Sequence, residues 1–285
     1  MISVLTLFCF LGALLGYVLA AGIGMAKGMD AQNIMENLGP GSSAEEISFV
    51  RVFLGINHLF TFLLPALATV WVFYKNKTVD FFQIGHFPKW TTIGLGILFI
   101  VVALPAVQYS YFINQKIPLP EWAKLMEEST GDAIKTLLVM PDIWTFLANI
   151  VVIALLPAVG EELVFRGVLQ AQFQRVMNNP HLAIWVTGAI FSAIHFQFEG
   201  FLPRWLLGVA LGYLYFWTKN LWVSIAAHFL NNGAQVAAMY FFADKMGGMD
   251  MDKDIEVPIY VAILSLVLAI FLGKKISEMQ PIELI

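Results

Sequence analysis

The sequence predicts an all-α polytopic membrane protein, with about eight transmembrane helices that enclose a polar cavity. Hydrophobic residues make up 59% of the 285 residues and charged residues only 13%, whereas soluble domains are about 45–50% apolar and about 25% charged. Most apolar residues fall in long runs, and a helix needs about 20 of them to cross a bilayer. Several runs nevertheless contain ionisable side chains, which indicates a wet interior lined by protein.

Eight apolar runs are expected to form one integral membrane domain over residues 1–285. They cover residues 2–26, 48–74, 91–112, 143–160, 182–197, 204–218, 220–242 and 257–273. No Lys or Arg precedes the first run, unlike the start of a secretory signal peptide, so this run is expected to remain as the first span. The fifth and sixth runs are short, and they fit only if they reach into the interface or lie buried among neighbours.

The connections between the runs predict the orientation. The basic residues on one side lie in short connections, at Lys75, Lys77, Lys89, Arg166, Arg175, Lys219, Lys274 and Lys275, whereas the other side has about as many basic residues in much longer loops. By the positive-inside rule the side with the short connections is cytoplasmic, so both termini are expected in the cytoplasm and the chain in the inner or plasma membrane. The segment 113–142 contains an amphipathic stretch with Trp122 and Leu125, which predicts an interfacial helix. The Asp- and Met-rich segment 243–256 is expected to be a solvated linker.

Three charged residues lie at or just beyond the end of the fourth apolar run. Glu161, Glu162 and Arg166 follow Pro157 and Gly160, which weaken a helix, so a kink or break is expected there. An isolated charge at the bilayer centre costs roughly 2.5–3.5 kcal/mol, so these groups must pair or be hydrated. Glu162 and Arg166 are four residues apart and share a helical face, which predicts an ion pair. Glu161 points about 100° away and is left for another role.

Two later runs each carry a histidine on a polar face. Phe191 and His195 are four residues apart in one run, and His228 and Asn232 in another. A lone intramembrane histidine, or one Glu–Arg pair, is often only a packing feature. Three polar faces on nearby helices favour a shared site, because polar groups inside membranes concentrate where function is carried out. The spacings Gly12-xxx-Gly16 and Gly208-xxx-Gly212 predict close helix packing.

These residue types leave two chemistries open. A carboxylate with a histidine can activate water, and a second histidine with an amide can hold an oxyanion. Alternatively, Glu161, His195 and His228 would be three ligands of a catalytic zinc, although the His-Glu-x-x-His helix is absent. We therefore expect that the protein needs no obligatory cofactor, and a bound zinc ion is the alternative. Ser192 and Ser224 are not framed by a nucleophile-elbow motif, which argues against a serine nucleophile. The sequence shows no inverted repeat, which would be expected of a transporter.

The three polar faces together resemble the CPBP family, which comprises type II CAAX prenyl proteases and the Abi proteins of bacteriocin processing and self-immunity. The family pattern is Glu-Glu-xxx-Arg, then Phe-xxx-His, then His-xxx-Asn, on successive membrane helices. This sequence matches all three motifs in that order. The motif-bearing core spans residues 143–240, and the first three runs carry no family motif.

The resemblance implies a helical fold around a conical cavity and an endopeptidase that cuts near membrane-embedded or prenylated C-termini. It implies that Glu161 is the general base, His195 its partner, and His228 and Asn232 the oxyanion donors, without a required metal. Supporting roles fall to Glu162, Arg166 and Phe191. The expected partners are the bilayer and a membrane-embedded or lipidated peptide, such as a CAAX protein or a bacteriocin or pheromone precursor. No basic patch suggests nucleic acid. The alternative is a non-catalytic membrane immunity or scaffold protein.

Overall fold

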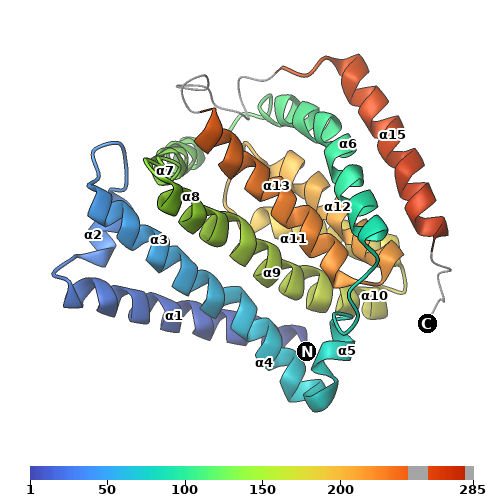
Figure 1. Ribbon diagram of the computed structural model, residues 1–285, viewed down its shortest axis with the longest axis horizontal. Helices are drawn as coiled ribbons and strands as arrows, with labels where there is room; N and C mark the ends of the chain where they lie inside the picture. The colour runs from blue at the N-terminus through green and yellow to red at the C-terminus, as the bar shows by residue number, and fades with distance from the viewer. Residues whose placement is uncertain (243–255, 280–285) are drawn as a thin grey trace.

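A computed structural model describes residues 1–242 and 256–279, and all regular elements in these ranges are helical (Figure 1). Within these ranges, five helices are long and apolar enough to cross a membrane, which identifies an integral membrane protein. They are Ile2–Ala26, Ala44–Phe81, Trp90–Asn114, Ile143–Met177 and Ile259–Glu278. Most of the expected linker, residues 243–255, lies outside the described residues.

The N-terminal part is a pair of long helices that lie side by side (Figure 1). The first is α1 (Ile2–Ala26), and the short α2 (Ala31–Glu36) leads to the second. The second helix runs through α3 (Ala44–His58), the π-helical segment η1 (Leu59–Leu63) and α4 (Leu64–Tyr74), before the short η2 (Lys75–Lys77) and α5 (Thr78–Phe81).

Small residues let these two helices touch. A Cβ atom on Gly12 would lie 1.9 Å from the carbonyl oxygen of Phe60, and one on Gly16 would lie 3.0 Å from the Phe60 Cβ. The Gly12-xxx-Gly16 spacing therefore serves close packing, as the sequence predicted.

The central helix runs without interruption from Ile143 to Met177. It comprises α8 (Ile143–Asn149), η3 (Ile150–Leu155), α9 (Leu156–Glu162), η4 (Leu163–Gln170) and α10 (Ala171–Met177). Both η3 and η4 are π-helical, and such segments are frequent at functional sites. A kink or break was expected near Pro157, but the helix continues there. The proline lies in the first turn of α9, directly after η3, where the backbone hydrogen bonds already follow the π-helical pattern.

Two side-chain contacts fix the start of the central helix. The Asp142 carboxylate caps α8 by accepting a hydrogen bond from the Thr145 amide at 2.8 Å, which satisfies one of the free amides of a helix start. The buried Arg51 of α3 donates to Asn149 Oδ1 at 2.9 Å, and the Asn149 amide donates to the Leu137 carbonyl at 2.7 Å. These bonds join α3, α7 and α8.

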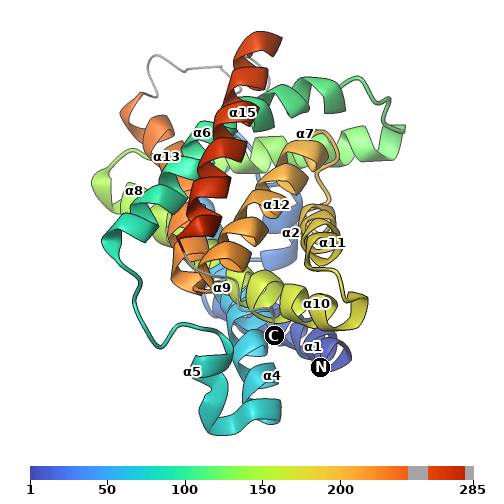
Figure 2. The same cartoon turned by 90° about the vertical axis from the view of Figure 1, so that its right-hand side faces the viewer.

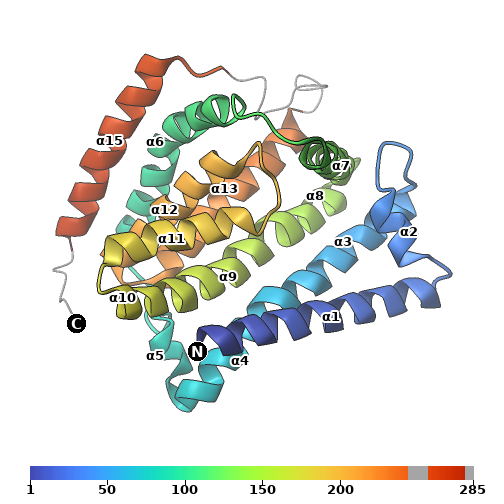
Figure 3. The same ribbon diagram turned by 180° about the vertical axis from the view of Figure 1, so that it is seen from behind.

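The helices α11 (Pro180–Ala193), α12 (Phe201–Thr218) and α13 (Leu221–Phe241) pack against the central helix (Figures 2 and 3). The remaining long helices are α6 (Trp90–Asn114), α7 (Glu121–Leu137) and α15 (Ile259–Glu278). The last helix, α15, lies on the outer side of α6 (Figure 1). The amphipathic stretch predicted in segment 113–142 is helical as α7.

Helices occupy all eight predicted runs, but in the part of the chain that the structure describes only five are long and apolar enough to be identified as spans. The 14-residue α11 is a shorter apolar helix. The number of eight spans and the enclosed polar cavity therefore stay predictions. Several boundaries were wrong: the fourth run was expected to end at residue 160, but its helix continues to Met177. The run expected over 182–197 ends as a helix at Ala193, so His195 lies in the turn that follows.

Candidate active site

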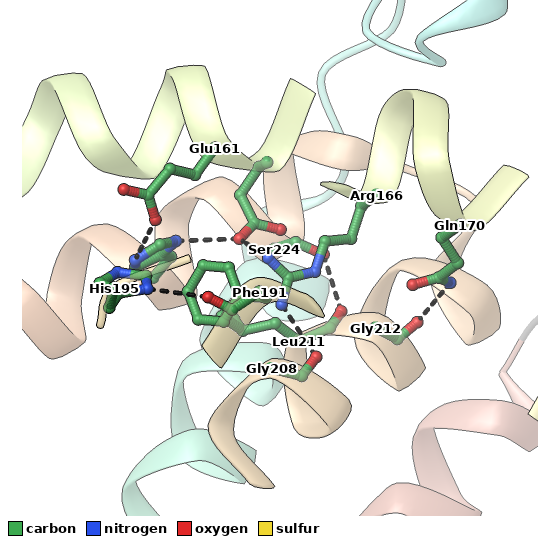
Figure 4. Close-up of polar contacts among 11 residues, drawn as sticks. Glu161, Arg166, Gln170, Phe191, His195, Gly208, Leu211, Gly212 and Ser224 are labelled. Carbon is green, nitrogen blue, oxygen red and sulfur yellow. Dashed lines mark hydrogen bonds and ion pairs between the residues drawn. The ribbon is translucent and has the colours of Figure 1, made fainter. Parts of the chain in front are cut away.

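Two buried glutamates end α9, and they have different partners. Glu161 is 7% exposed and Glu162 is wholly buried. Arg166, also wholly buried, donates from Nη1 to Glu162 Oε1 at 2.5 Å (Figure 4). This contact confirms the ion pair that the four-residue spacing predicted. Two opposite charges cancel at the pair, which offsets part of their desolvation cost.

Arg166 is held from three directions. Its Nη2 donates to the carbonyl of Gly208 at 2.8 Å, and its guanidinium carbon lies 4.8 Å from the centre of the Phe191 ring. One turn further along, the Gln170 amide donates to the carbonyl of Gly212 at 3.0 Å (Figure 4). Both glycines therefore present a backbone acceptor to a polar side chain of η4.

The same two glycines leave no room for a side chain. A Cβ atom on Gly208 would lie 3.1 Å from the Gly188 Cα, and one on Gly212 would lie 2.8 Å from Gln170 Oε1. The close packing predicted from Gly208-xxx-Gly212 is confirmed. The bonds to Arg166 and Gln170 add a role that spacing alone did not predict.

His228 joins the two glutamates. Its Nδ1 lies 2.9 Å from Glu162 Oε1, and its Nε2 lies 3.9 Å from Glu161 Oε2. A carboxylate only accepts hydrogen bonds, so Nδ1 carries the hydrogen and Nε2 is the nitrogen presented to Glu161. Glu162 therefore fixes the orientation of His228 as well as pairing with Arg166.

Phe191 of α11 packs against both histidines. Its ring centre lies 5.1 Å from that of His195 and 5.9 Å from that of His228, in edge-to-face arrangements. His195 Nδ1 donates to the Phe191 carbonyl at 2.8 Å (Figure 4), which leaves the lone pair of its Nε2 as an acceptor. The shared face predicted for Phe191 and His195 is confirmed, although His195 lies beyond the helix.

Asn232 has a looser arrangement than the other predicted site residues. Its amide points to the Ile153 carbonyl of η3 at 3.4 Å, and its oxygen accepts a hydrogen bond from Asn231 at 3.1 Å. A distance of 3.4 Å is at the long end for a hydrogen bond. The structure therefore brings Glu161, Glu162, Arg166, Phe191 and His228 into direct contact, with His195 on Phe191 and Asn232 directed at η3.

The hydroxyls of the two nearby serines are engaged with the backbone. Ser192 donates to the Phe201 carbonyl at 2.7 Å and Ser224 to the Leu211 carbonyl at 3.2 Å. The expectation that neither serine is a nucleophile stays a prediction.

The predicted zinc ligands do not form a metal site in this arrangement. Within residues 1–242 and 256–279, no group of three His, Cys, Asp or Glu side chains is placed to hold a metal ion. Glu161, His195 and His228 therefore do not fit the zinc alternative as they stand.

A third histidine near this cluster was missed by the sequence reasoning. His58 ends α3 and packs against α9, where a Cβ atom on Gly160 would lie 2.9 Å from its Nε2. It has no motif partner at helical spacing, and its neighbours in the sequence are apolar or uncharged. Only its position inside an apolar run could have signalled it.

The fold and the site define a class: a helical integral membrane protein with glutamate, arginine and histidine in one buried polar cluster. Residues 143–234 match the family described as Rce1-like type II CAAX prenyl endopeptidase, and this stretch is a domain of that family. The uncharacterized protein YpbD of Bacillus subtilis (strain 168) is 37% identical over 91 residues, which are 30% of this chain and 42% of that protein. The match thus spans less than half of that relative. No solved structure matches the chain.

Proposed function

We propose that this protein is an intramembrane endopeptidase that hydrolyses peptide bonds of membrane-embedded or lipidated substrates. The observation that carries the proposal is the unequal pair of glutamates inside the family domain. Arg166 and His228 both contact Glu162, whereas the ion-pair partner of Glu161 among the described residues is His228, whose Nε2 lies 3.9 Å away. One carboxylate is therefore structural and the other is available for chemistry.

In the proposed reaction Glu161 takes a proton from a water molecule, and the resulting hydroxide attacks the carbonyl carbon of the peptide. His195 holds that water through the lone pair of its Nε2. The oxyanion accepts hydrogen bonds from His228 Nε2, which must be protonated to donate, and from the Asn232 amide. Glu161 then gives the proton to the leaving amine as the C–N bond breaks.

An apolar pocket supports a substrate with a hydrophobic or lipidated portion. The pocket has a volume of about 490 Å³ and adjoins the turn that carries His195. Side chains of α7 and of the α11–α12 connection form it, including Trp122, Met126, Phe196, Phe198 and Phe201. Such a pocket suits an isoprenoid or a large apolar side chain placed next to the scissile bond.

Replacing Glu161 with Gln tests the proposal. The change keeps the shape of the side chain but removes the base, so we expect turnover to fall about 10²- to 10⁴-fold. The assay uses purified protein in detergent with internally quenched peptides, one ending in a farnesylated cysteine plus three residues and one embedded through an apolar helix. Glu36→Gln, at an exposed glutamate in α2, is the matched control and should keep full activity.

The same variant separates an enzyme from a non-catalytic immunity or scaffold protein. If Glu161→Gln folds, inserts and fully preserves the cellular role, the catalytic proposal is wrong. Comparing the membrane proteomes of wild-type and Glu161→Gln cells identifies the substrates, because uncleaved precursors accumulate only in the variant.

A further inference from the structure

His195 lies in a short connection, residues 194–200, between the end of α11 at Ala193 and the start of α12 at Phe201. Phe196, the residue after His195, has a φ of 52°. A residue with a large side chain rarely adopts this conformation and keeps it only where the surrounding structure holds it. The contacts that hold this connection therefore determine where the His195 ring lies.

Asn114, the last residue of α6, makes two hydrogen bonds to this part of the chain. Its Nδ2 donates to the Phe198 carbonyl at 2.7 Å, and its Oδ1 accepts from the Leu202 amide at 2.8 Å. A carbonyl only accepts and a backbone N–H group only donates, so one side-chain amide satisfies both partners. Asn114 is 4% exposed, so water has little access to replace either bond.

The bond to Leu202 also supplies a cap for α12. The N-cap residue of α12 is Gly200, which has no side chain to bond the first amides of the helix. These amides lack partners within the helix, and Asn114 provides one from 88 positions earlier in the chain. Asn114 therefore fixes the connection and the first turn of α12 together.

The helix α7 contacts the same connection, but from a more exposed position. The Glu199 amide donates to Glu127 Oε1 at 3.0 Å, and Trp122 packs edge-to-face on Phe198 with 5.3 Å between ring centres. Trp122 is exposed and Glu127 is half-buried. Water competes with these contacts more than with those of Asn114, so Asn114 supplies the firmer constraint.

We propose that Asn114 is a positioning residue that keeps the His195 ring at the active site by holding the α11–α12 connection. This inference rests on the proposed function, in which His195 holds the attacking water, and deepens it. Asn114 lies in α6, outside the family domain at residues 143–234. One of the motif residues of that domain therefore depends for its placement on a helix that precedes the domain.

Loss of both hydrogen bonds in Asn114→Ala tests this role in purified protein. We expect kcat to fall about 10- to 100-fold for the farnesylated and the helix-embedded peptide alike, because both reactions need the water held by His195. Asn37→Ala is the control, since it removes an exposed asparagine that bonds Asn33 one turn earlier, and kcat should not change. A change confined to KM in Asn114→Ala overturns the inference.

The isosteric variant Asn114→Asp gives the test a pH signature and applies even if Asn114→Ala does not fold. A protonated carboxyl group can donate to the Phe198 carbonyl and accept from the Leu202 amide, whereas an ionised one cannot donate. The kcat of Asn114→Asp, divided by that of the wild type at the same pH, should therefore rise as the pH falls and the carboxyl group takes up its proton. A ratio that does not change with pH overturns the inference.

Amide hydrogen exchange makes the test independent of turnover. Asn114→Ala should speed exchange in the peptide that contains Glu199 and Leu202 about tenfold, with little change elsewhere. Faster exchange there with an unchanged kcat overturns the inference. Faster exchange in a protein whose wild type cleaves neither peptide supports the role of Asn114 in holding the connection and contradicts the proposed catalysis.

Discussion

At the scale of single residues, environment separates two chemically identical side chains. Glu161 and Glu162 are neighbours in the sequence, yet Arg166 lies against only one of them. The four-residue spacing was enough to predict that pair, because helical geometry is local. The contact between Glu162 and His228 spans 66 residues and depends on how α9 packs on α13. No local pattern carries that information.

Loss of Arg166 should destabilise the fold strongly. Arg166→Met removes the positive partner of a wholly buried carboxylate, and such a change costs roughly 3–5 kcal/mol. The measurement is unfolding in mixed micelles with increasing SDS, followed by circular dichroism. Arg175→Met, which removes an exposed arginine that bonds Tyr74, should change stability by less than about 0.5 kcal/mol.

A double variant shows whether the cost comes from the unpaired charge. Glu162→Gln combined with Arg166→Met should be less destabilised than the sum of the two single variants, because no uncompensated charge of this pair remains. Strict additivity of the two losses would contradict an ion pair.

At the scale of elements, the sequence predicted where helices lie better than where they end. The run over 182–197 was expected to be helical throughout, but α11 stops at Ala193 and the chain turns at Phe196 with φ of 52°. The π-helical segments were not predicted either. These segments depend on contacts with neighbouring helices. The spacing of apolar residues predicts which side of a helix is buried, but it does not predict where the hydrogen bonding changes from α-helical to π-helical.

Close packing of α11 on α12 should be necessary for activity. In Gly208→Ala the new methyl group would meet the Gly188 backbone and the Phe191 ring, both at 3.1 Å. Phe191 must then shift, and both histidines that pack on it follow. We expect kcat/KM to fall about 10- to 100-fold, since small displacements of catalytic groups have effects of this size. Gly94→Ala, at a glycine of α6 with open space around it, should have no such effect.

The packing of α1 should be coupled to activity in a similar way. Gly12→Val would force a side chain into the Phe60 carbonyl, and so displace η1, which begins directly after His58. Because η1 packs against α9, which carries Glu161, we expect kcat/KM for the farnesylated peptide to fall in this variant. Gly22→Val is the matched control in the same helix, because no atom lies within 4 Å of the new Cβ. An unchanged kcat/KM in a well-folded Gly12→Val protein would contradict the coupling.

At the scale of the whole molecule, composition was sufficient to predict a helical membrane protein. Composition was not sufficient to count the membrane spans. The helices α11, α12 and α13 bury polar and small residues inside the protein, so they need not be as apolar as helices that face lipid. The positive-inside rule predicts an orientation with both termini in the cytoplasm, and this stays a prediction.

Labelling of single cysteines tests this orientation. Cys9 is the chain's only cysteine, so Cys9→Ser gives a background without thiols. We expect Lys116→Cys, in the connection after α6, to react with a membrane-impermeant maleimide in intact cells. Glu278→Cys, at the end of α15, should react only after the cells are permeabilised. The reverse pattern would place both termini outside.

The π-helical segment η3 has a consequence for the spacing of residues along the central helix. Asn149, before it, must face Arg51 on α3, while Glu161 and Glu162, after it, must face His228 on α13. A π-helical turn contains one residue more than an α-helical turn would, and one residue corresponds to about 100° of rotation. Deletion of Val151 alone would therefore turn one set of polar groups away from its partners, although no polar group is lost. The number of apolar residues between these two contacts is as much a part of the site as the charged residues themselves.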